Sequence, residues 1–368
     1  MIDVIIAGGG PAGLATAIRA RMAGLEVVVL DPMRPPIDRA CGEGLMPDGA
    51  ELLEKLGVDL SGVESRAFRG IRYRDGELVA EGRFPGAGGL GMRRTALHAA
   101  MCRRAEDLGV DLRWGVRATS IRQDGFETDE GLVVGRWLVG ADGRTSRVRR
   151  WVGLDGRPTR RPRIGLRRHY AVEPWSDLVE VSWVDGCEAY VTPVGEGLVG
   201  VAMLFERGAR SFDELLRRFP KLELRLQGAS IASKDRGSGP LEQRCRQVVR
   251  GNLALVGDAS GYLDPITGEG LALSFHHAFA FVDAILAGDL SRYAAAHRRV
   301  GRYPKAITRL LLSIERHPGL RRRVMRSLAA DPTLMSRFLA LKMNVRGPHM
   351  LGGDGLLSLA AAAIRGSR

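Results

Sequence analysis

Three glycines near the start of the chain have the spacing of a phosphate-binding turn. Gly8, Gly10 and Gly13 follow the apolar run Met1–Ala7 and precede a stretch of small residues. In this pattern the first glycine permits a tight turn, the second lets the backbone approach a pyrophosphate, and the third allows a helix to pack closely on a strand. The helix N-terminus stabilises the phosphate charge, and Asp31, 18 residues after the last glycine, is placed to accept hydrogen bonds from a ribose. The motif predicts a dinucleotide site without choosing between NAD and FAD.

Two later motifs also follow apolar stretches and place an aspartate beside a glycine. Residues 140–149 have the sequence GADGRTSRVR, in which Asp142 precedes Gly143. Further along, Gly257 and Asp258 follow an apolar strand pattern and lead into DPITGEG at residues 264–270. Either aspartate could serve only as the cap of a loop or helix, and capping is compatible with cofactor contact.

The three motifs, in this order and at this spacing, resemble those of the flavoprotein monooxygenases of the para-hydroxybenzoate hydroxylase type. Geranylgeranyl reductases and flavin-dependent halogenases are relatives of the same group. The resemblance covers about residues 1–287. It implies an α/β fold: a Rossmann-type FAD-binding domain (GR2-like) with an inserted antiparallel-sheet substrate domain and C-terminal helices. It also implies non-covalent FAD, with NAD(P)H as a transient electron donor, because no second strand–turn–helix unit of the Rossmann type is recognisable.

The resemblance assigns roles within these motifs. Asp258 would bind the ribityl chain of FAD, and the backbone of 268–270 would lie against the pyrimidine end of the flavin ring, where a helix N-terminus stabilises an anionic reduced flavin. Arg94 would approach the FAD phosphates, with Arg93 as an alternative, and Asp142 would lie near the flavin and the passage of the pyridine nucleotide. The residues expected to bind FAD are Gly8, Gly10, Pro11, Ala12, Gly13, Asp31, Arg39, Ala40, Cys41, Gly42, Arg94, Val116, Asp142, Gly143, Gly257, Asp258, Pro265, Gly268, Glu269, Gly270 and Leu271.

The segment around Cys41 resembles one branch of the family. Residues 39–47, RACGEGLMP, are similar to the Cys-Gly-x-Gly-Leu-x-Pro stretch of the geranylgeranyl reductases, in which the cysteine lies beside the flavin. A thiol there could tune the flavin, protonate a substrate carbon or fill a small space. Ser260-Gly261 also stands where the hydroxylases usually carry a histidine.

Other residues argue against the reductases and the halogenases. The reductases carry Tyr-x-Trp-x-Phe-Pro on the substrate sheet, whereas this chain has Tyr190-Val-Thr-Pro193 and lacks both later aromatics. The halogenase motif Gly-x-Trp-x-x-Ile-Pro is missing, and no lysine precedes Lys55. Cys41 and Tyr190 are therefore the two candidate catalytic residues.

The elements that must position these residues follow from hydrophobic patterns. A strand, a helix from about Pro11 to Ala23 and a second strand Leu25–Leu30 form a βαβ unit. We expect the FAD-binding domain at residues 1–67, 96–160 and 247–300, the substrate domain at 68–95 and 161–246, and a helical region at 301–368. Further expected elements are a helix at 95–108, strands at 111–114, 118–123 and 132–139, alternating strands over 163–205, and a helix at 270–287. Prolines 304, 318 and 332 are expected to divide the helical region.

Composition limits the partners. The net charge is +13 and only five basic residues are lysine, but no nucleic-acid-binding module is recognisable. The Arg-rich helical region is either a packed helix with a basic face or a weak contact with a membrane surface.

Four cysteines without a CxxC pair, and no segment typical of a secretory signal or a membrane span, favour a cytoplasmic protein, peripheral at the membrane if that contact exists. His276-His277 lacks acidic or cysteine partners, so we expect no metal site. The oligomeric state is left open.

These features together predict an NAD(P)H-driven, FAD-dependent monooxygenase that hydroxylates an aromatic or polyketide-like hydrophobic small molecule. Hydride transfer to FAD, reaction with oxygen and oxygen transfer to an electron-rich carbon would follow one another in a site that excludes water. A reductase that saturates C=C bonds of an isoprenoid or lipid is the alternative. A non-catalytic flavin-binding partner protein is a second alternative.

Overall fold

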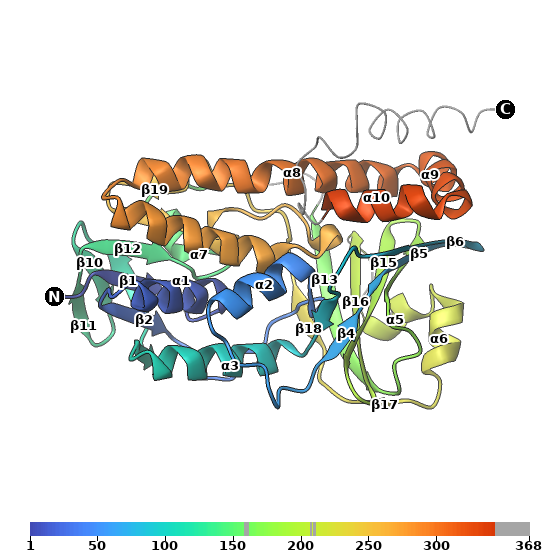
Figure 1. Ribbon diagram of the computed structural model, residues 1–368, viewed down its shortest axis with the longest axis horizontal. Coiled ribbons are helices and arrows are strands. Elements are labelled where there is room, and N and C mark those ends of the chain that lie inside the picture. The colour runs from blue at the N-terminus through green and yellow to red at the C-terminus, as the bar shows by residue number, and fades with distance from the viewer. Residues whose placement is uncertain (158–161, 207, 209–210, 343–368) are drawn as a thin grey trace.

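The computed structural model describes residues 1–157, 162–206, 208 and 211–342. A six-stranded sheet lies towards one end of the elongated molecule and an eight-stranded sheet towards the other, and the long helix α8 (Leu290–Arg316) runs along both (Figure 1). The mixed α/β architecture agrees with the predicted fold class.

The six-stranded sheet is built around the first strand of the chain. Its order is β19-β20-β12-β1-β2-β8, and every neighbouring pair except β19–β20 is parallel. The strands are β1 (Val4–Ala7), β2 (Val27–Asp31), β8 (Asp111–Trp114), β12 (Trp137–Gly140), β19 (Val249–Arg250) and β20 (Leu253–Leu255). The carboxyl ends of the five parallel strands therefore meet at one edge, where open parallel sheets bind ligands.

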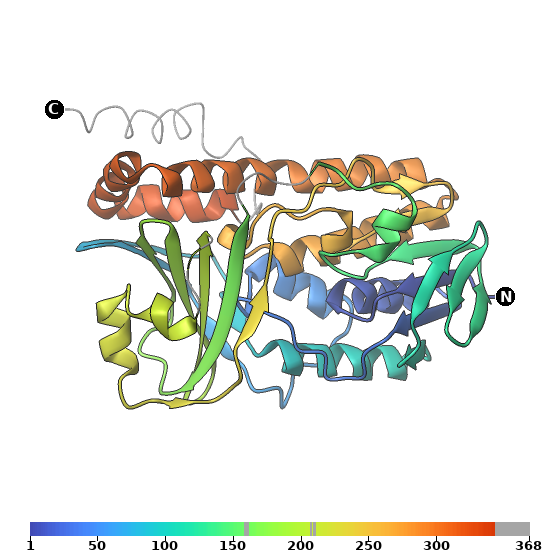
Figure 2. The same cartoon turned by 180° about the vertical axis from the view of Figure 1, so that it is seen from behind.

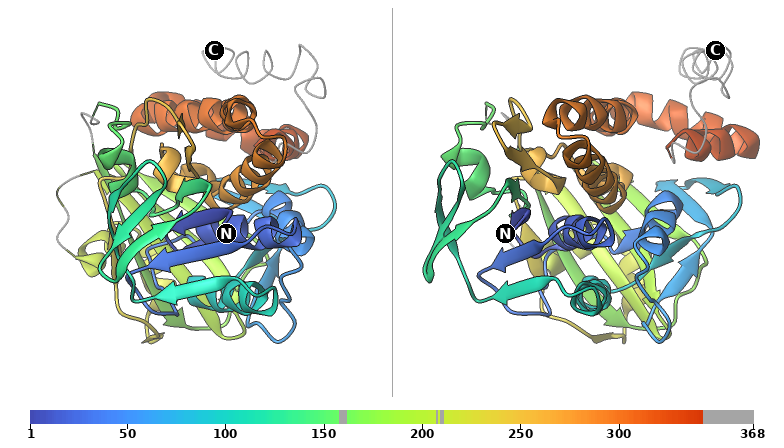
Figure 3. Two further views of the ribbon diagram at one scale, coloured as in Figure 1. Left: turned by 90° about the vertical axis from the view of Figure 1, so that its left-hand side faces the viewer. Right: turned by 60° about the vertical axis from the view of Figure 1, so that its left-hand side comes forward.

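Both faces of this sheet are covered. Side chains alternate along β1, so neighbouring residues pack in the cores on opposite faces. Val4 and Ile6 pack in the core that contains the helices α1 (Pro11–Met22), α3 (Arg94–Asp107) and α7 (Gly270–Leu286). Ile5 and Ala7 pack with Phe126 in the core against a small three-stranded sheet (Figure 3). The strands of that sheet are β9 (Ala118–Ile121), β10 (Gly125–Thr128) and β11 (Gly131–Val134). The single strand expected at 132–139 is thus wrong: β11 and β12 belong to different sheets, because the chain turns at residues 135–136.

The eight-stranded sheet follows the order β17-β13-β16-β15-β14-β5-β6, with β18 paired to β13. All its pairs are antiparallel except β5–β14. The strands are β5 (Gly70–Asp75), β6 (Leu78–Arg83), β13 (Arg163–Ala171), β14 (Val179–Val184), β15 (Cys187–Gly195), β16 (Leu198–Glu206), β17 (Ser230–Ile231) and β18 (Arg236–Ser238).

The two faces of this sheet differ in polarity. The outer face is mostly apolar, with Arg168 as a charged exception, and packs against α5 (Phe212–Leu216) and α6 (Pro220–Leu226), which Figure 2 shows in yellow. On the inner face Arg167, Ala202, Tyr190, Val181 and Tyr73 are partners across five neighbouring strands, so their side chains share that face. The inner face therefore brings charged and aromatic groups towards the part of the molecule that contains the six-stranded sheet.

Short elements join the two halves. A small sheet has the order β3-β7-β4. The remaining elements are β3 (Gly44–Leu45), β4 (Arg66–Phe68), β7 (Gly89–Gly91), α2 (Pro47–Lys55), α4 (Arg147–Trp151), and the 3-10 turns η1 (Gly257–Ser260) and η2 (Pro265–Thr267). The strand β3 begins three residues after Cys41, so this small sheet fixes the course of the Cys41 loop.

The C-terminal helices are α8, α9 (Pro318–Ala330) and α10 (Pro332–Lys342). Pro318 and Pro332 each begin a helix, where a missing N–H costs nothing. Pro304, however, lies inside α8, so the expected division there is wrong. Its ring is buried, and packing of the helix offsets the cost of an interior proline, which is about 3 kcal/mol. Residues 343–368 of the predicted helical region lie outside the described residues. Within the described part of the chain, no helix has the length and apolar character needed to cross a membrane.

Candidate functional site

The glycine turn between β1 and α1 has the close contacts that only glycine allows. Gly8 has a φ of +117°, and a Cβ there would lie 2.4 Å from the carbonyl oxygen of Ala141. A Cβ on Gly13 would lie 1.9 Å from the carbonyl oxygen of Gly8. Around Gly10, by contrast, the nearest atom to such a Cβ is Nη2 of Arg94 at 3.8 Å. The turn is thus packed against the protein at two glycines and open at the third, where a pyrophosphate would approach.

Asp31 and a buried histidine hold this turn in place. The carboxylate of Asp31 accepts hydrogen bonds from the backbone N–H groups of Gly9 (2.7 Å) and Met33 (2.8 Å). His98 on α3 lies 2.8 Å, through Nε2, from the carbonyl oxygen of Gly9. Because a carbonyl only accepts, Nε2 carries the proton. Burial, the largest cause, lowers the pKa of His98 and favours this neutral form. His98 was not predicted from the sequence, since a lone histidine in a helix gives no recognisable signal.

Two arginines stand at the start of α3, and Arg94 lies beside the open glycine. The buried Nε atoms of Arg93 and Arg94 have no hydrogen-bond partner in the protein. Arg94 also acts electrostatically on Asp258 and Cys41, whose pKa values it lowers against the larger effect of burial. Guanidinium groups with free donors beside an exposed turn fit the phosphates of a dinucleotide.

In the second motif, Asp142 caps a helix with one carboxylate oxygen, and its other oxygen has no hydrogen-bond partner. Oδ2 of Asp142 accepts hydrogen bonds from the N–H groups of Arg147 (2.6 Å) and Val148 (3.1 Å) at the start of α4. Its Oδ1 is buried without a partner, and burial raises the pKa of this carboxyl. Capping therefore accounts for one oxygen of Asp142 and leaves the other for a ligand.

The third motif is tied to the second by a buried arginine. Arg149 donates to Asp155 (2.6 Å) and to the carbonyl oxygen of Ala259 (3.0 Å), so it joins α4 to η1. Gly257 has a φ of +55°, and a Cβ there would lie 2.5 Å from Cβ of Ala12. Asp258 follows, and burial raises the pKa of its carboxyl. The aspartate of the late motif is thus held directly beside the glycine turn.

The loop before α7 is anchored to the eight-stranded sheet. Asp264 accepts a hydrogen bond from the N–H of Ile266 (3.0 Å) and forms an ion pair with Arg163 on β13 (3.0 Å). Burial raises the pKa of Asp264 to about 7. Gly268 then adopts the left-handed conformation, and α7 begins at Gly270. The N-terminus of α7 therefore has a defined position relative to β13.

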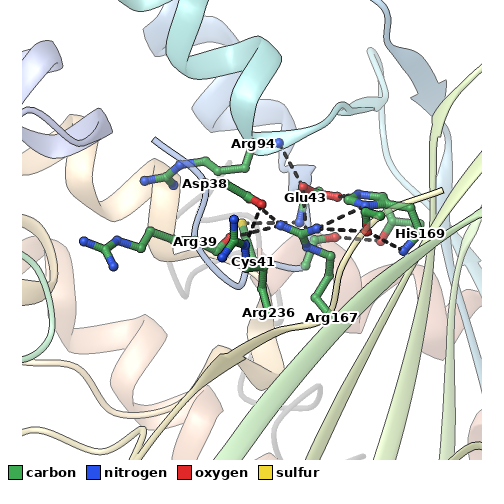
Figure 4. Close-up of polar contacts among 11 residues, drawn as sticks. Asp38, Arg39, Cys41, Glu43, Arg94, Arg167, His169 and Arg236 are labelled. Carbon is green, nitrogen blue, oxygen red and sulfur yellow. Dashed lines mark hydrogen bonds and ion pairs between the residues drawn. The ribbon is translucent and has the colours of Figure 1, made fainter. Parts of the chain in front are cut away.

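Cys41 lies in a loop that a buried glutamate holds against the sheet (Figure 4). Glu43, 3% exposed, is the one non-glycine residue among those described with a positive φ, +59°. Its N–H donates to Sγ of Cys41 (3.3 Å), and its Oε1 accepts from the N–H of Arg94 (2.9 Å). Its Oε2 lies 2.5 Å from Nε2 of His169 on β13. One side chain thus connects the Cys41 loop, the start of α3 and the eight-stranded sheet.

The hydrogen bonds around His169 define its tautomer. Nη1 of Arg167 lies 3.1 Å from Nδ1 of His169, and an arginine can only donate. Nδ1 is therefore the acceptor, and Nε2–H donates to Glu43. Arg167 and Arg236 also pair with Asp38 at the start of the loop (Figure 4). Although burial acts the other way, these guanidinium groups hold the pKa of Asp38 below its usual value.

A second buried network surrounds Tyr190 on β15. Its hydroxyl donates to Glu188 (2.5 Å), and Glu188 pairs with Arg163 (2.9 Å), which also binds Asp264. Burial, followed by the charge of Glu188, raises the pKa of Tyr190 well above its ordinary value. Tyr190 and Ala202 remain partly exposed in the middle of the sheet, so protein atoms do not close the space before them.

Comparison with known proteins agrees with this geometry. A family model described as an FAD binding domain matches residues 1–185, just over half of the chain. The chain belongs to this family. The unpaired arginine nitrogens, the open glycine and the free oxygen of Asp142 fit FAD, so the predicted cofactor is confirmed at the level of the family.

Relatives of this FAD-binding chain include both reductases and a monooxygenase. It is 26% identical to menaquinone reductase of Mycobacterium tuberculosis over 317 residues, 79% of this chain and 78% of that protein. Digeranylgeranylglycerophospholipid reductase of Methanosarcina acetivorans is 27% identical over 324 residues, 78% and 77% of the two chains. Para-nitrophenol 4-monooxygenase of a Pseudomonas strain is 28% identical over 321 residues, 77% of each. A solved flavoprotein/dehydrogenase of Cytophaga hutchinsonii has the same fold, with a TM-score of 0.86 at 18% identity over 100% of both chains. The resemblance to FAD-dependent monooxygenases and geranylgeranyl reductases is thus confirmed.

The other residues predicted to bind FAD have varied surroundings. Pro11 begins α1, Pro265 begins η2, and Leu271 packs at the edge of the main core. The side chain of Val116 is buried in the core beneath the six-stranded sheet, so only its backbone is available to a ligand. The rest of the Cys41 loop is more open, with Arg39 and Gly42 exposed and Ala40 partly exposed. Gly143 has a φ of +77°, and Glu269 is buried at the start of α7.

The two adjacent histidines of α7 have different environments. His277 is buried and stacks on His297 of α8, with ring centres 4.2 Å apart. His276 is partly exposed and lies 3.7 Å from Asp48. Among the residues described, no group of three His, Cys, Asp or Glu side chains could hold a metal ion.

Proposed function

We propose that this chain is an NAD(P)H-driven, FAD-dependent monooxygenase that hydroxylates a phenolic or similarly hydroxylated hydrophobic molecule, of aromatic or polyketide-like type. When bound, FAD supplies the chemistry that accepts hydride and activates oxygen. The likeness to para-nitrophenol 4-monooxygenase supports the reaction class.

The observation that carries the proposal is the Tyr190–Glu188 hydrogen bond. A phenol hydroxyl carries one hydrogen, and Tyr190 donates it in a hydrogen bond to Glu188 (2.5 Å). The tyrosine oxygen therefore offers only lone pairs to a ligand before the sheet. Such an acceptor selects a substrate that donates, such as a phenol. If Tyr190 passes its own proton to Glu188 as it accepts the proton of the substrate hydroxyl, the substrate becomes a phenolate, and its ring gains the electron density that oxygen transfer to carbon requires.

The surrounding residues hold this acceptor beside the flavin loop. Arg163 contacts both Glu188 and Asp264, so it fixes the carboxylate of Glu188 and the loop before α7 in one arrangement. Tyr190 also lies 3.5 Å, through its hydroxyl, from the carbonyl oxygen of Ile266. A substrate that binds Tyr190 would thus lie between the inner face of the sheet and the N-terminus of α7.

A library of phenols, screened for NAD(P)H consumption with and without oxygen, tests the proposal. We expect oxygen-dependent turnover and incorporation of ¹⁸O from ¹⁸O₂ into the product. Product formed without oxygen, or product lacking the label, contradicts it. Tyr190→Phe separates the substrate contact from flavin reduction, since it removes the acceptor but leaves the FAD motifs intact.

A reductase that saturates C=C bonds of an isoprenoid or lipid is the second candidate, and the environment of Cys41 favours it. Burial raises the pKa of this thiol, which keeps it protonated. A protonated thiol suits proton donation to carbon better than nucleophilic attack. This candidate predicts anaerobic turnover by dithionite-reduced enzyme and its loss in Cys41→Ser. The four free cysteines of the chain support a reducing, cytoplasmic setting for either reaction.

A further inference from the structure

The excess positive charge of the chain is confined to its C-terminal part. Residues 1–289 contain 39 Lys and Arg and 39 Asp and Glu, so they are formally neutral. Residues 290–342 contain 13 Lys and Arg but only two acidic residues. An arginine-rich composition spread over the whole protein would not give this division. The charge belongs to the helices α8, α9 and α10.

The arginines of α8 form a stripe on its outer side. Arg292, Arg299, Arg302, Arg309 and Arg316 are all exposed. Steps of seven and three residues return to one side of a helix, and the stripe extends for roughly 36 Å at 1.5 Å per residue. The opposite side of α8 is buried against α7 and η2. The stripe therefore points away from the protein.

Within the described residues, Arg292 at the start of the stripe pairs with Asp289 (3.8 Å), and most of the stripe is not neutralised. Among the described residues no carboxylate lies within ion-pair distance of Arg299, Arg302 or Arg309, whereas arginines of the eight-stranded sheet pair repeatedly with acidic partners. The helices α9 and α10 extend the layer above the eight-stranded sheet (Figure 1). Their exposed arginines are Arg322, Arg323, Arg326 and Arg337.

We propose that the layer formed by α8, α9 and α10 docks this protein on an anionic lipid surface. A long layer of exposed cations, most of them without an acidic partner, complements a continuous negative surface. Leu310 is 42% exposed beside Arg309, and an apolar side chain among arginines suits the boundary between headgroups and acyl chains. The helix α8 also lines a cavity that reaches Asp258. Docking would therefore place the loop between Asp258 and α7 near the lipid. The benefit to catalysis rests on the proposed function, since a hydrophobic substrate concentrates in membranes, but the docking itself does not.

Vesicle sedimentation with the purified holoprotein tests this surface without any substrate. The vesicles are pure phosphatidylcholine, or phosphatidylcholine with about 30% phosphatidylglycerol. The stripe variant is Arg299→Gln/Arg302→Gln/Arg309→Gln. The matched control is Arg103→Gln/Arg117→Gln/Arg217→Gln, which removes the same charge from exposed residues on other elements. The FAD absorbance of each preparation shows whether it is folded.

We expect the wild type to bind the anionic vesicles and not the neutral ones, and to be released by salt. Each cation near such a surface contributes about fivefold, so the stripe variant should partition on the order of 100-fold more weakly. The control should change by less than about threefold, because its arginines lie off the layer. Equal loss in both variants, equal binding to neutral vesicles, or no binding by the wild type overturns the proposal. Stripe-dependent binding to a DNA duplex without vesicle binding also overturns it. A failed oxygenase assay leaves the vesicle result unaffected.

Discussion

The two sheets of this protein carry their functional groups in different ways. Around the six-stranded sheet the predicted cofactor-binding residues lie in short loops. Close steric contacts there involve residues that are near one another in the sequence or that follow neighbouring strands. On the eight-stranded sheet they lie on one face of strands that are far apart in sequence, such as β5 and β13. The first arrangement leaves a local motif, whereas the second depends on strand register, and a shift of one residue would turn every side chain to the other face.

The largest effect we expect is from Gly13→Ala. Its Cβ would lie 1.9 Å from the carbonyl oxygen of Gly8, which cannot move without opening the turn. We expect a protein without bound FAD, destabilised by more than about 3 kcal/mol, as measured by flavin absorbance and urea unfolding. Gly319→Ala, where no atom lies within 4 Å, is the control and should keep its flavin. Full flavin content in Gly13→Ala would show that the turn does not bind the cofactor.

Glu43→Gln tests the connection between the two regions. It removes the charge from a buried group that pairs with His169 and lies near Arg167. Removing one partner of a buried pair costs roughly 3–5 kcal/mol, which urea unfolding would detect. Arg168→Gln, on the outer face of the same strand, is the control, because its partners Asp213 and Asp235 are exposed.

The Glu43→Gln variant should also change the reactivity of the Cys41 thiol. The charge of Glu43 contributes to the raised pKa of this thiol, so its removal lowers that pKa. Alkylation by iodoacetamide at about pH 8 should therefore become severalfold faster. An unchanged alkylation rate would show that Glu43 acts only on stability.

Asp264 should make stability depend on pH. Burial raises its pKa in the folded protein to about 7, above the value of an unfolded chain. The folded state thus holds the proton more tightly, and stability should fall as pH rises from about 4 to about 7, by on the order of 1 kcal/mol per unit. Asp264→Asn should flatten this part of the profile in urea unfolding at several pH values. A wild-type curve that rises over this window would contradict the assignment.

Tyr190→Phe should have the smallest effect on folding. Loss of the hydrogen bond to Glu188 costs about 1–2 kcal/mol in urea unfolding. If Tyr190 accepts a hydrogen bond from substrate, turnover should fall at least about tenfold while anaerobic flavin reduction by NAD(P)H stays near wild type. Phe212→Leu, on the outer side of the sheet, controls for repacking. Equal loss in both half-reactions would assign Tyr190 a purely structural role.

Prediction from the sequence succeeded where a single local pattern sufficed. The βαβ unit, the exact strand 111–114 and the long helix α7 were predicted, because apolar runs and glycine stops define them. The helix α2 was not expected, although it is amphipathic and has a proline at its first position. The strand β10 was not expected because Phe126 is its only large apolar residue. Arg149 and His98 were also missed, because each acts through a backbone carbonyl distant in the sequence.

By itself the sequence determined the cofactor turn, because glycine spacing constrains the backbone whatever surrounds it. It also determined the charge of α8, α9 and α10, which is a count of residues. Only the tertiary structure decided that Glu43 meets His169, 126 residues away, and that Arg163 meets Asp264, 101 residues away. Such pairs form when strand register and domain packing bring buried charges together, and neither can be deduced from residues that are neighbours along the chain.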